Sequence, residues 1–334
     1  MPKEKKISYI INLIGTILLF GVLCFVFDGN ILGSKTSYLK GIIIMCMITV
    51  IMVCSLNLIT GFMGEFSLGH AGFMSIGAYA GAITTIAIHE SGIVLPPFIL
   101  FLIAILVGGV VTAICGVLVG IPALRLRGDY LAIVTVAVAE IVRVAFTNFQ
   151  ITGGGKTLSG ISKVSDFHYV YITAAVSVTI MYMYIRSRFG RVVTAIREDY
   201  IAASASGINV TYYKVLTFAI SAFFAGVAGA IYAHYITSLI PTKFSFMYSS
   251  EFLTMVILGG SGSLTGSIIG GSILSALPEA LRSFQSYRML MYSIVLVLVM
   301  IFKPSGLFGT YEFSLTRVLK KIFAKKDKGG IDHE

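Results

Sequence analysis

The sequence predicts an all-α polytopic membrane protein of about ten transmembrane helices, and three observations support this fold class. Apolar residues make up 57% of the 334 positions and charged residues only 12%, which is about half the charged share of an ordinary soluble domain. The apolar residues form separate runs, most of them close to the ~20 residues that a helix needs to cross a bilayer. The chain also has 35 Gly, and small residues let membrane helices pack closely.

Each long apolar run is interpreted as a membrane helix. A last run lies at 287–302, and before it the apolar region 250–281 is interrupted by several glycines. The first run follows three lysines and has no small-residue cleavage pattern, so we interpret it as a helix and not as a signal peptide. The seven runs before residue 237 are 10–27, 39–60, 67–88, 95–121, 130–149, 170–185 and 215–236.

The placement of lysine and arginine predicts how the region 250–281 crosses the membrane. Basic residues gather in the cytoplasmic loops of membrane proteins. With the N-terminus inside and a single crossing of 250–281, each side holds 12 basic residues. If the region enters and returns as two short helices that break at 259–263, the inside holds 17 and the outside 7. We therefore predict ten membrane helices with both termini cytoplasmic, in a membrane domain over 1–305 followed by a basic tail over 306–334.

The remaining composition excludes several classes of function. The net charge of +10 follows the topology described above, and no stretch interleaves basic and aromatic residues as a nucleic-acid surface does. The four cysteines lie in apolar runs without a C-x-x-C pair, which is typical of small buried side chains. Neither a metal site nor a paired nucleophile and base is visible, so neither a metal nor an enzymatic activity is expected.

Ionisable residues inside a predicted span are candidates for the lining of a translocation pathway, because an unpaired charge in a bilayer is costly. Glu140 and Arg143 stand three residues apart and so share one face of the run 130–149. A structural pair whose charges neutralise each other is the alternative. Asn57 is a milder case of the same kind.

Two glycine-rich segments add further candidates. Glu65, Ser67 and His70 lie among four glycines where two spans meet, which indicates either a polar gate region or a tight cytoplasmic turn with a buried His. Ser67 is expected to cap the helix that follows. Gly259 and Gly260 mark a broken helix, which lies either beside the transport route or in a close helix contact.

The hydrophilic segment 186–214 combines basic residues with a run of small ones. Small residues ahead of a glycine suit a short helix that another protein contacts closely. A solvated amphipathic connector is the alternative, and it does not explain the small residues. The candidate contact residues are Arg191, Arg197, Glu198, Asp199, Ala202, Ala203 and Gly207.

Several stretches together resemble a known family. Over about 40–305 the chain reads, in order, GEFSLGHAGF from Gly64 with GAY from Gly77, LRLRGDYLAI from Leu124, EIVR from Glu140, TGG from Thr152, RFGR from Arg188, AIRED from Ala195 and GGSGS from Gly259. This ordered set resembles the permease subunits of branched-chain amino acid ABC importers, within the larger family that includes simple-sugar permeases. The LRLRGDY stretch is similar to the M-type of the two permease types.

The resemblance implies a permease in the bacterial inner membrane, surrounded by membrane lipid. Its implied partners are two cytoplasmic ATP-binding subunits, a second homologous permease and an external substrate-binding protein. ATP is then bound by the partners, so this chain needs no cofactor. The resemblance also implies that 186–214 is the coupling loop that docks on the ATPase, with Ile201 where the family's E-A-A motif has Glu.

The resemblance leaves the substrate open, because the same family includes importers of urea and short amides. Branched-chain or similar amino acids are the primary expectation. Outside the family, the alternative is a secondary transporter or channel that works without ATPases. A requirement for ATP in reconstituted vesicles separates these two classes.

Overall fold

The structure is a computed structural model that describes residues 21, 36–126, 128–303, 306–307 and 309. Residues 41–310 form one compact unit, and residues 1–40 with 311–334 form another. The predicted span 10–27, apart from residue 21, lies outside the described residues. So does the predicted tail 306–334, apart from residues 306, 307 and 309.

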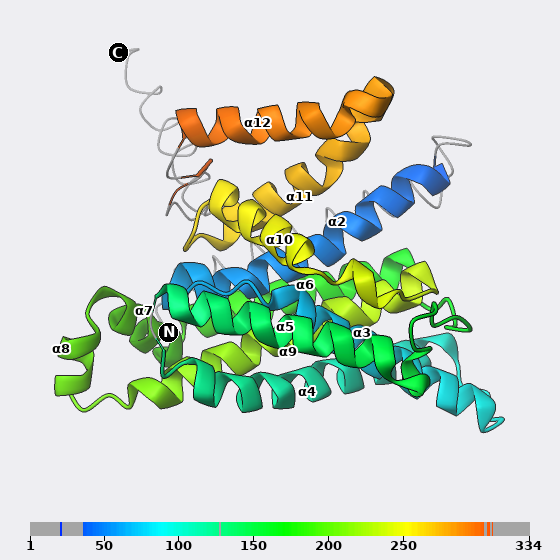
Figure 1. The fold of residues 1–334 in the computed structure, drawn as a ribbon, viewed down its shortest axis with the longest axis horizontal. Coiled ribbons are helices and arrows are strands. Elements are labelled where there is room, and N and C mark those ends of the chain that lie inside the picture. Colours follow the sequence, from blue (N-terminus) through cyan, green and yellow to red (C-terminus); the bar gives the residue numbers. More distant parts are fainter. Residues whose placement is uncertain (1–20, 22–35, 127, 304–305, 308, 310–334) are drawn as a thin grey trace, which may run out of the picture. The chain divides into compact units, whose positions relative to one another are not determined.

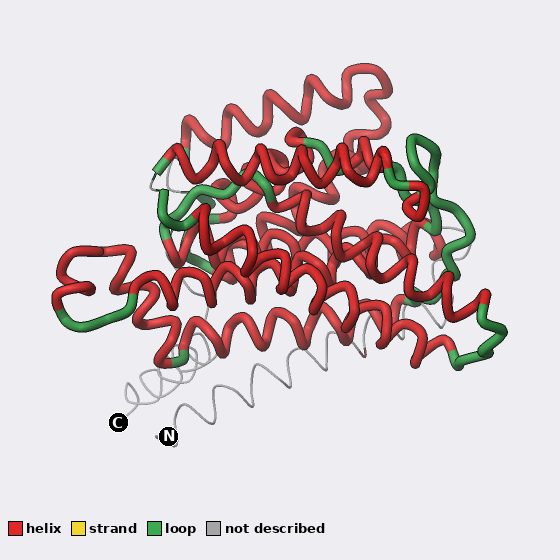
Figure 2. Tube along the Cα trace, turned by 60° about the horizontal axis from the view of Figure 1, so that its bottom comes forward, coloured by secondary structure: helices red, strands yellow, loops and turns green. Residues whose placement is uncertain are grey.

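The described part of the chain is helical and has no strand beyond one isolated bridge between Leu158 and Leu239 (Figure 1, Figure 2). Single-turn to two-turn 3₁₀ segments occur at Gln150–Thr152, Pro241–Lys243 and Leu281–Tyr287. The α-helices are α2 (Thr36–Asn57), which continues as a π-helix (Leu58–Met63), α3 (His70–Glu90), α4 (Pro97–Ala123), α5 (Asp129–Asn148), α6 (Phe167–Arg186), α7 (Arg188–Glu198), α8 (Tyr200–Ala205), α9 (Val210–Ile236), α10 (Phe246–Gly259), α11 (Leu264–Ala280) and α12 (Arg288–Phe302).

Six of the described helices are long and apolar enough to cross a membrane: α2 with its π-helical end, α3, α4, α5, α6 and α9. They correspond to the six apolar runs predicted between residues 39 and 236, with ends that differ by a few residues. The polytopic all-α fold class is therefore confirmed. At ~1.5 Å of rise per residue, α10 and α11 extend only about 21 and 26 Å, short of a ~30 Å hydrocarbon core.

Small residues bring three of these helices into backbone contact. A Cβ atom added at Gly77 of α3 would overlap the backbone of Gly226 in α9, and one at Gly229 would overlap the backbone of Met74. At Gly108 of α4 it would lie 2.8 Å from the carbonyl oxygen of Gly77. Close approach of this kind is the usual way in which membrane helices associate, so these glycines serve the α3–α4–α9 contact.

The region 250–281 is broken where the glycines predict. Helix α10 ends at Gly259 and α11 begins at Leu264. Gly260 and Gly262 have φ angles of +119° and +85°, a region that side chains disfavour. The two helices run antiparallel: a Cβ added at Gly266 would overlap the Gly259 carbonyl, and one at Gly270, further along α11, would lie 3.2 Å from the carbonyl oxygen of Met255, further back in α10. The predicted pair of short helices is thus a helical hairpin closed at its turn by glycine contacts.

The polar segments gather at two opposite ends of the helices. Figure 1 and Figure 2 show α7 and α8 extending beyond the ends of α4 and α9 at one end. The connections 91–96 and 149–166 lie at the other end (Figure 1). The predicted topology likewise assigns 186–214 and 149–166 to opposite sides of the membrane.

Candidate functional site

The candidate site lies where the end of α2 meets α7 and the turn between α10 and α11. This region contains the π-helix Leu58–Met63, which follows α2 directly. A π-helix is uncommon and occurs often at functional sites. Residues from three segments that are far apart in the sequence make hydrogen bonds here, and the predicted candidates Asn57, Glu65 and Arg197 are among them.

Asn57 joins α2 to the turn of the α10–α11 hairpin. Its side-chain nitrogen donates to the Ser263 carbonyl at 2.9 Å and to the Ser267 Oγ at 2.7 Å. Its side-chain oxygen accepts from the Gly262 backbone nitrogen at 3.0 Å. Asn57 is fully buried, so all of these bonds replace contacts with water that it has lost.

Arg197 joins α7 to the same place. Its Nη1 donates to the Gly61 carbonyl at 2.7 Å, and its Nε and Nη2 donate to the Oε1 of Glu198 at 3.1 and 2.5 Å. A Cβ atom added at Gly64 would lie 2.5 Å from the Arg197 Cγ, and one at Gly262 would lie 3.3 Å from its Nη1. The arginine therefore lies in a space that these glycines leave open.

Glu65 forms a buried ion pair with Lys214 near the start of α9. The two side chains are 11% and 9% exposed, and the ammonium also lies 5.7 Å from the centre of the Tyr200 ring. The sequence pattern places Lys214 in a hydrophilic cytoplasmic segment and does not indicate this pair. Because unpaired charges are costly to bury, the pair ties the segment after α2 to α9.

Ser67 and His70 lie just beyond this pair, in a buried polar cluster at the start of α3. The prediction that Ser67 caps the helix is wrong, because α3 begins at His70 with Gly69 at the cap position and no side-chain cap bond. His70 shares a 2.8 Å hydrogen bond with the Ser55 Oγ, which also donates to the Met52 carbonyl. The Ser55 proton is therefore engaged, and the Nε2–H of His70 donates to Ser55. Neither the Ser67 Oγ nor the His70 Nδ1 has a partner among the described residues.

Gly259 and Gly260 lie in the α10–α11 hairpin. Gly259 packs against Gly266, and Gly260 begins the turn with its positive φ. For Gly259 the close helix contact, which the sequence left as one of two alternatives, is present in the structure. Because Gly260 directly precedes the residues that Asn57 binds, the hairpin turn is part of the candidate site.

Glu140 and Arg143 form an ion pair of 2.6 Å on α5. Their side chains are 36% and 28% exposed, so both are half-buried. Glu140 lines an open hollow of about 450 Å³ together with Ile141, Val144 and Ala145. In the described part of the chain, the side chains of this pair make no hydrogen bond or ion pair with the site around Asn57, and α5 is the least buried of the six long apolar helices.

The segment α7–α8 is a small folded element with its own core. Ser187 caps α7 by accepting from the Gly190 nitrogen, and Asp199 caps α8 by accepting from the nitrogens of Ile201 and Ala202. Gly207 follows α8 with φ +80°, the conformation in which a glycine ends a helix. Three side chains from α7, α8 and α9 meet in the core, namely Ile196, Ala203 and Val210.

The candidate contact residues of this segment divide into two groups. Ala203 faces the small core and is 6% exposed, so its side chain holds the segment together. Ala202 and Asp199 are exposed, and so are Arg191 and Glu198. Ile201 was named only for its departure from the family motif, yet it is 76% exposed. Ile201 is therefore accessible on the surface of this projecting segment.

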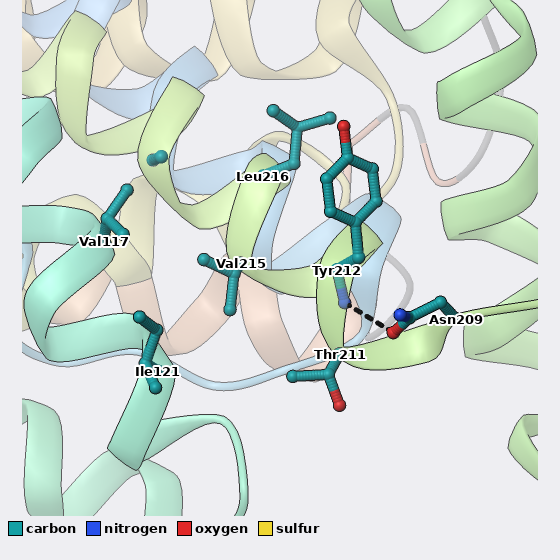
Figure 3. Close-up of a pocket in the computed structure, with 8 residues that line it drawn as sticks. Val117, Ile121, Asn209, Thr211, Tyr212, Val215 and Leu216 are labelled. Atoms are coloured by element: carbon teal, nitrogen blue, oxygen red, sulfur yellow. Dashed lines mark hydrogen bonds between the residues drawn. The ribbon is translucent and has the colours of Figure 1, made fainter.

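A second hollow, of about 480 Å³, lies between the end of α4 and the start of α9. In Figure 3, Val117 and Ile121 approach it from α4, and Val215, Leu216 and Tyr212 from α9. Asn209 caps the start of α9, where its side-chain oxygen accepts a 3.1 Å hydrogen bond from the Tyr212 backbone nitrogen. The lining is mainly apolar, and sequence analysis did not predict this hollow.

The family model described as "Branched-chain amino acid transport system / permease component" matches residues 38–303. The chain belongs to this family. The match covers every helix from α2 to α12, and so it includes the site around Asn57, the α5 ion pair and the segment α7–α8.

Individual members of the family agree with the match. The high-affinity branched-chain amino acid transport system permease protein LivM of Salmonella typhimurium is 34% identical over 85% of this chain and 72% of its own length. LivM of Escherichia coli is 34% identical over 78% of this chain and 68% of its own length. The permease protein LivH of Escherichia coli is 36% identical over 43% of this chain and 46% of its own length. No solved structure matches the chain.

Proposed function

We propose that this chain is the transmembrane permease subunit of an ATP-driven ABC importer that moves branched-chain or related amino acids into the cell. The observation that carries the proposal is the projecting segment α7–α8, which is folded around its own core and bonded through Arg197 to the end of α2. Such an element suits contact with an ATPase subunit. Family membership and the LivM relatives support the amino-acid substrate.

The remaining partners follow from the same proposal. A second homologous permease completes the pathway, which is supported by the similarity of this chain to both LivM and LivH. Two ATP-binding subunits dock on the cytoplasmic side, and an external binding protein delivers the substrate. This chain performs no chemistry and needs no cofactor of its own.

The topology of ten membrane helices is part of the proposal. The six long apolar helices account for six of them, and 10–27, α10, α11 and α12 are the other four. Both termini are then cytoplasmic, the membrane domain covers 1–305, and 306–334 forms the basic tail. The location is the inner membrane of a bacterial cell. Support comes from the count of basic residues and from the opposite placement of 149–166 and α7–α8 (Figure 1).

Purification of the tagged chain from gently solubilised membranes tests the function. We expect stoichiometric recovery of an ATP-binding subunit and a second permease, and uptake of leucine into vesicles only when ATP is present. Recovery of the chain alone, with ATP-independent uptake, would contradict the importer and favour a secondary transporter. Uptake of urea or a short amide, without leucine, would keep the class and change the substrate.

We propose that the exposed face of α5 lines the translocation pathway. An ion pair that is half-exposed within an apolar helix needs water or protein beside it, because contact with lipid is costly. Glu140 and Arg143 are such a pair, and the open surface beside Glu140 is accessible to solvent. The apolar side chains around them then meet the second permease.

Single and double substitutions of Glu140 and Arg143 are expected to change leucine uptake differently. We expect Glu140→Gln to lower leucine uptake by about tenfold, since it leaves Arg143 without a counter-charge. The double variant Glu140→Gln with Arg143→Met should be closer to the wild type. Uptake by the reconstituted complex is the measurement. Co-purification of the ATP-binding subunit with each variant is the control for assembly. If the double variant loses the product of the two single effects, the charges do not neutralise each other.

A further inference from the structure

We propose that Arg197 and Asn57 are positioning residues that transmit movement of α7–α8 to the glycine turn of the α10–α11 hairpin. The inference rests on the proposed function, in which α7–α8 docks on an ATPase subunit. It assigns a route from that docking segment to a broken helix pair through two side chains that lie 140 positions apart in the sequence. Neither residue needs to touch the substrate.

The first contact in the proposed route is made by the Arg197 guanidinium. All three of its nitrogens donate, one to the Gly61 carbonyl and two to Glu198. A planar guanidinium held at both ends has little freedom to swing. Gly64 and Gly262 lie against it, at distances where a Cβ atom would crowd the side chain. A shift of α7 is therefore passed to the carbonyl of Gly61 and not absorbed by side-chain rotation.

The second contact in the route lies between the π-helix and the turn of the α10–α11 hairpin. Gly61 lies next to Asn57, and a Cβ atom at Gly61 would overlap both the Asn57 side-chain oxygen and the Gly262 nitrogen. The two segments are in direct contact there, with no side chain between them. The wide turn of a π-helix interrupts the regular helical bonding of α2, so its displacement does not require the whole helix to move.

The third contact in the route is made by the side-chain amide of Asn57. It is bonded to the Gly262 nitrogen, the Ser263 carbonyl and the Ser267 Oγ. The carboxamide is fully buried, and breaking a buried hydrogen bond is costly when its partner is left unsatisfied. The turn 260–263 contains two glycines with positive φ, which tolerate changes of backbone angle. It is expected to follow the movement of α2.

If Arg197 and Asn57 act one after the other in transmitting the movement, their variants should affect uptake in a specific way. Arg197→Met should lower the ratio of leucine uptake to ATP hydrolysis by about tenfold, because the charged hydrogen bond to the Gly61 carbonyl is lost together with the two to Glu198. Arg197→Lys, which retains a donor for the Gly61 carbonyl, should recover part of the uptake. The combination of Arg197→Met with Asn57→Ala should be no worse than the more severe single variant, since both interrupt one route.

The experiment uses the full complex reconstituted in vesicles, with ATP hydrolysis and leucine uptake measured in the same preparation. Ser267→Ala removes only one of the Asn57 bonds, so it provides a milder variant if Asn57→Ala fails to fold. Arg282→Met is the matched control, because Arg282 is also paired with a nearby Glu but is 67% exposed and lies far from α7 in the sequence. We expect it to leave the ratio of uptake to hydrolysis unchanged.

Two results would overturn the inference while leaving the proposed function intact. One is a parallel fall of hydrolysis and uptake in Arg197→Met, which would indicate a structural anchor. The other is a double variant whose loss equals the product of the single losses, which would indicate independent sites. If uptake by the wild-type complex does not require ATP, the proposed function fails first and this inference fails with it.

Discussion

Ile201→Lys is expected to abolish recovery of the ATP-binding subunit while the permease itself stays folded. Ile201 is 76% exposed on α8, and α8 lies at the far end of the projecting segment (Figure 1). An aliphatic side chain in that position is suited to a pocket on a partner, and a few side chains that fill central pockets carry most of the binding free energy of an interface. A buried ammonium without a counter-charge adds a desolvation penalty.

The expected loss is at least about 100-fold in affinity, which corresponds to about 3 kcal/mol or more at ~1.4 kcal/mol per tenfold. Co-purification of the ATP-binding subunit with the tagged chain measures it. Val94→Lys is the matched control, because Val94 is 96% exposed but lies in the connection 91–96 at the opposite end of the helices. Normal recovery of the ATP-binding subunit with Ile201→Lys would remove α8 from the docking surface.

A substitution at Ala203 cannot test docking on the ATP-binding subunit, because this side chain is buried within the segment. The sequence alone does not show which residues of α8 are buried. Ala202 and Ala203 are indistinguishable in a run of small residues, yet one is exposed and the other lies in the core with Ile196 and Val210. Which of two neighbouring alanines faces a partner depends on how α8 packs on α7 and α9. A charged side chain at Ala203 would disrupt the segment itself and report on folding, not on docking.

The long helices and the hairpin turn were predictable because their causes are local. Apolar runs set the positions of the six long helices, and the glycines at 259–262, with the count of basic residues, indicated the break between α10 and α11. Asn57 was recognised as a polar residue in a span. Its partners at 262, 263 and 267 were not predictable, because they lie more than 200 positions away and share no pattern with it.

Lys214 was assigned to a solvated segment for a related reason. A lysine at the edge of an apolar run is normally a sign of the cytoplasmic boundary. In the structure it lies in the first turns of α9 and is buried against Glu65, a residue that was itself recognised. Only the fold brings the end of α2 and the start of α9 together, so neither composition nor spacing identifies the pair.

This buried pair leads to a prediction about stability. Lys214→Met is expected to destabilise the chain by about 3–5 kcal/mol, because it leaves the Glu65 carboxylate buried without a counter-charge. The double variant Glu65→Gln with Lys214→Met should recover most of that loss, since a neutral amide beside a thioether leaves no charge to bury. Thermal unfolding in one detergent, at one scan rate, measures the difference between the two variants.

The exposed pair of Glu279 and Arg282 provides the control. Its side chains are 29% and 67% exposed, and solvent-exposed ion pairs contribute about 0–1 kcal/mol, so Arg282→Met should hardly change the unfolding temperature. If Lys214→Met were as mild as this control, the Glu65 carboxylate would have access to water. If the double variant were as unstable as Lys214→Met, the loss would come from packing of the lysine stem against Tyr200 and its neighbours, and the ion pair would not be what ties the segment after α2 to α9.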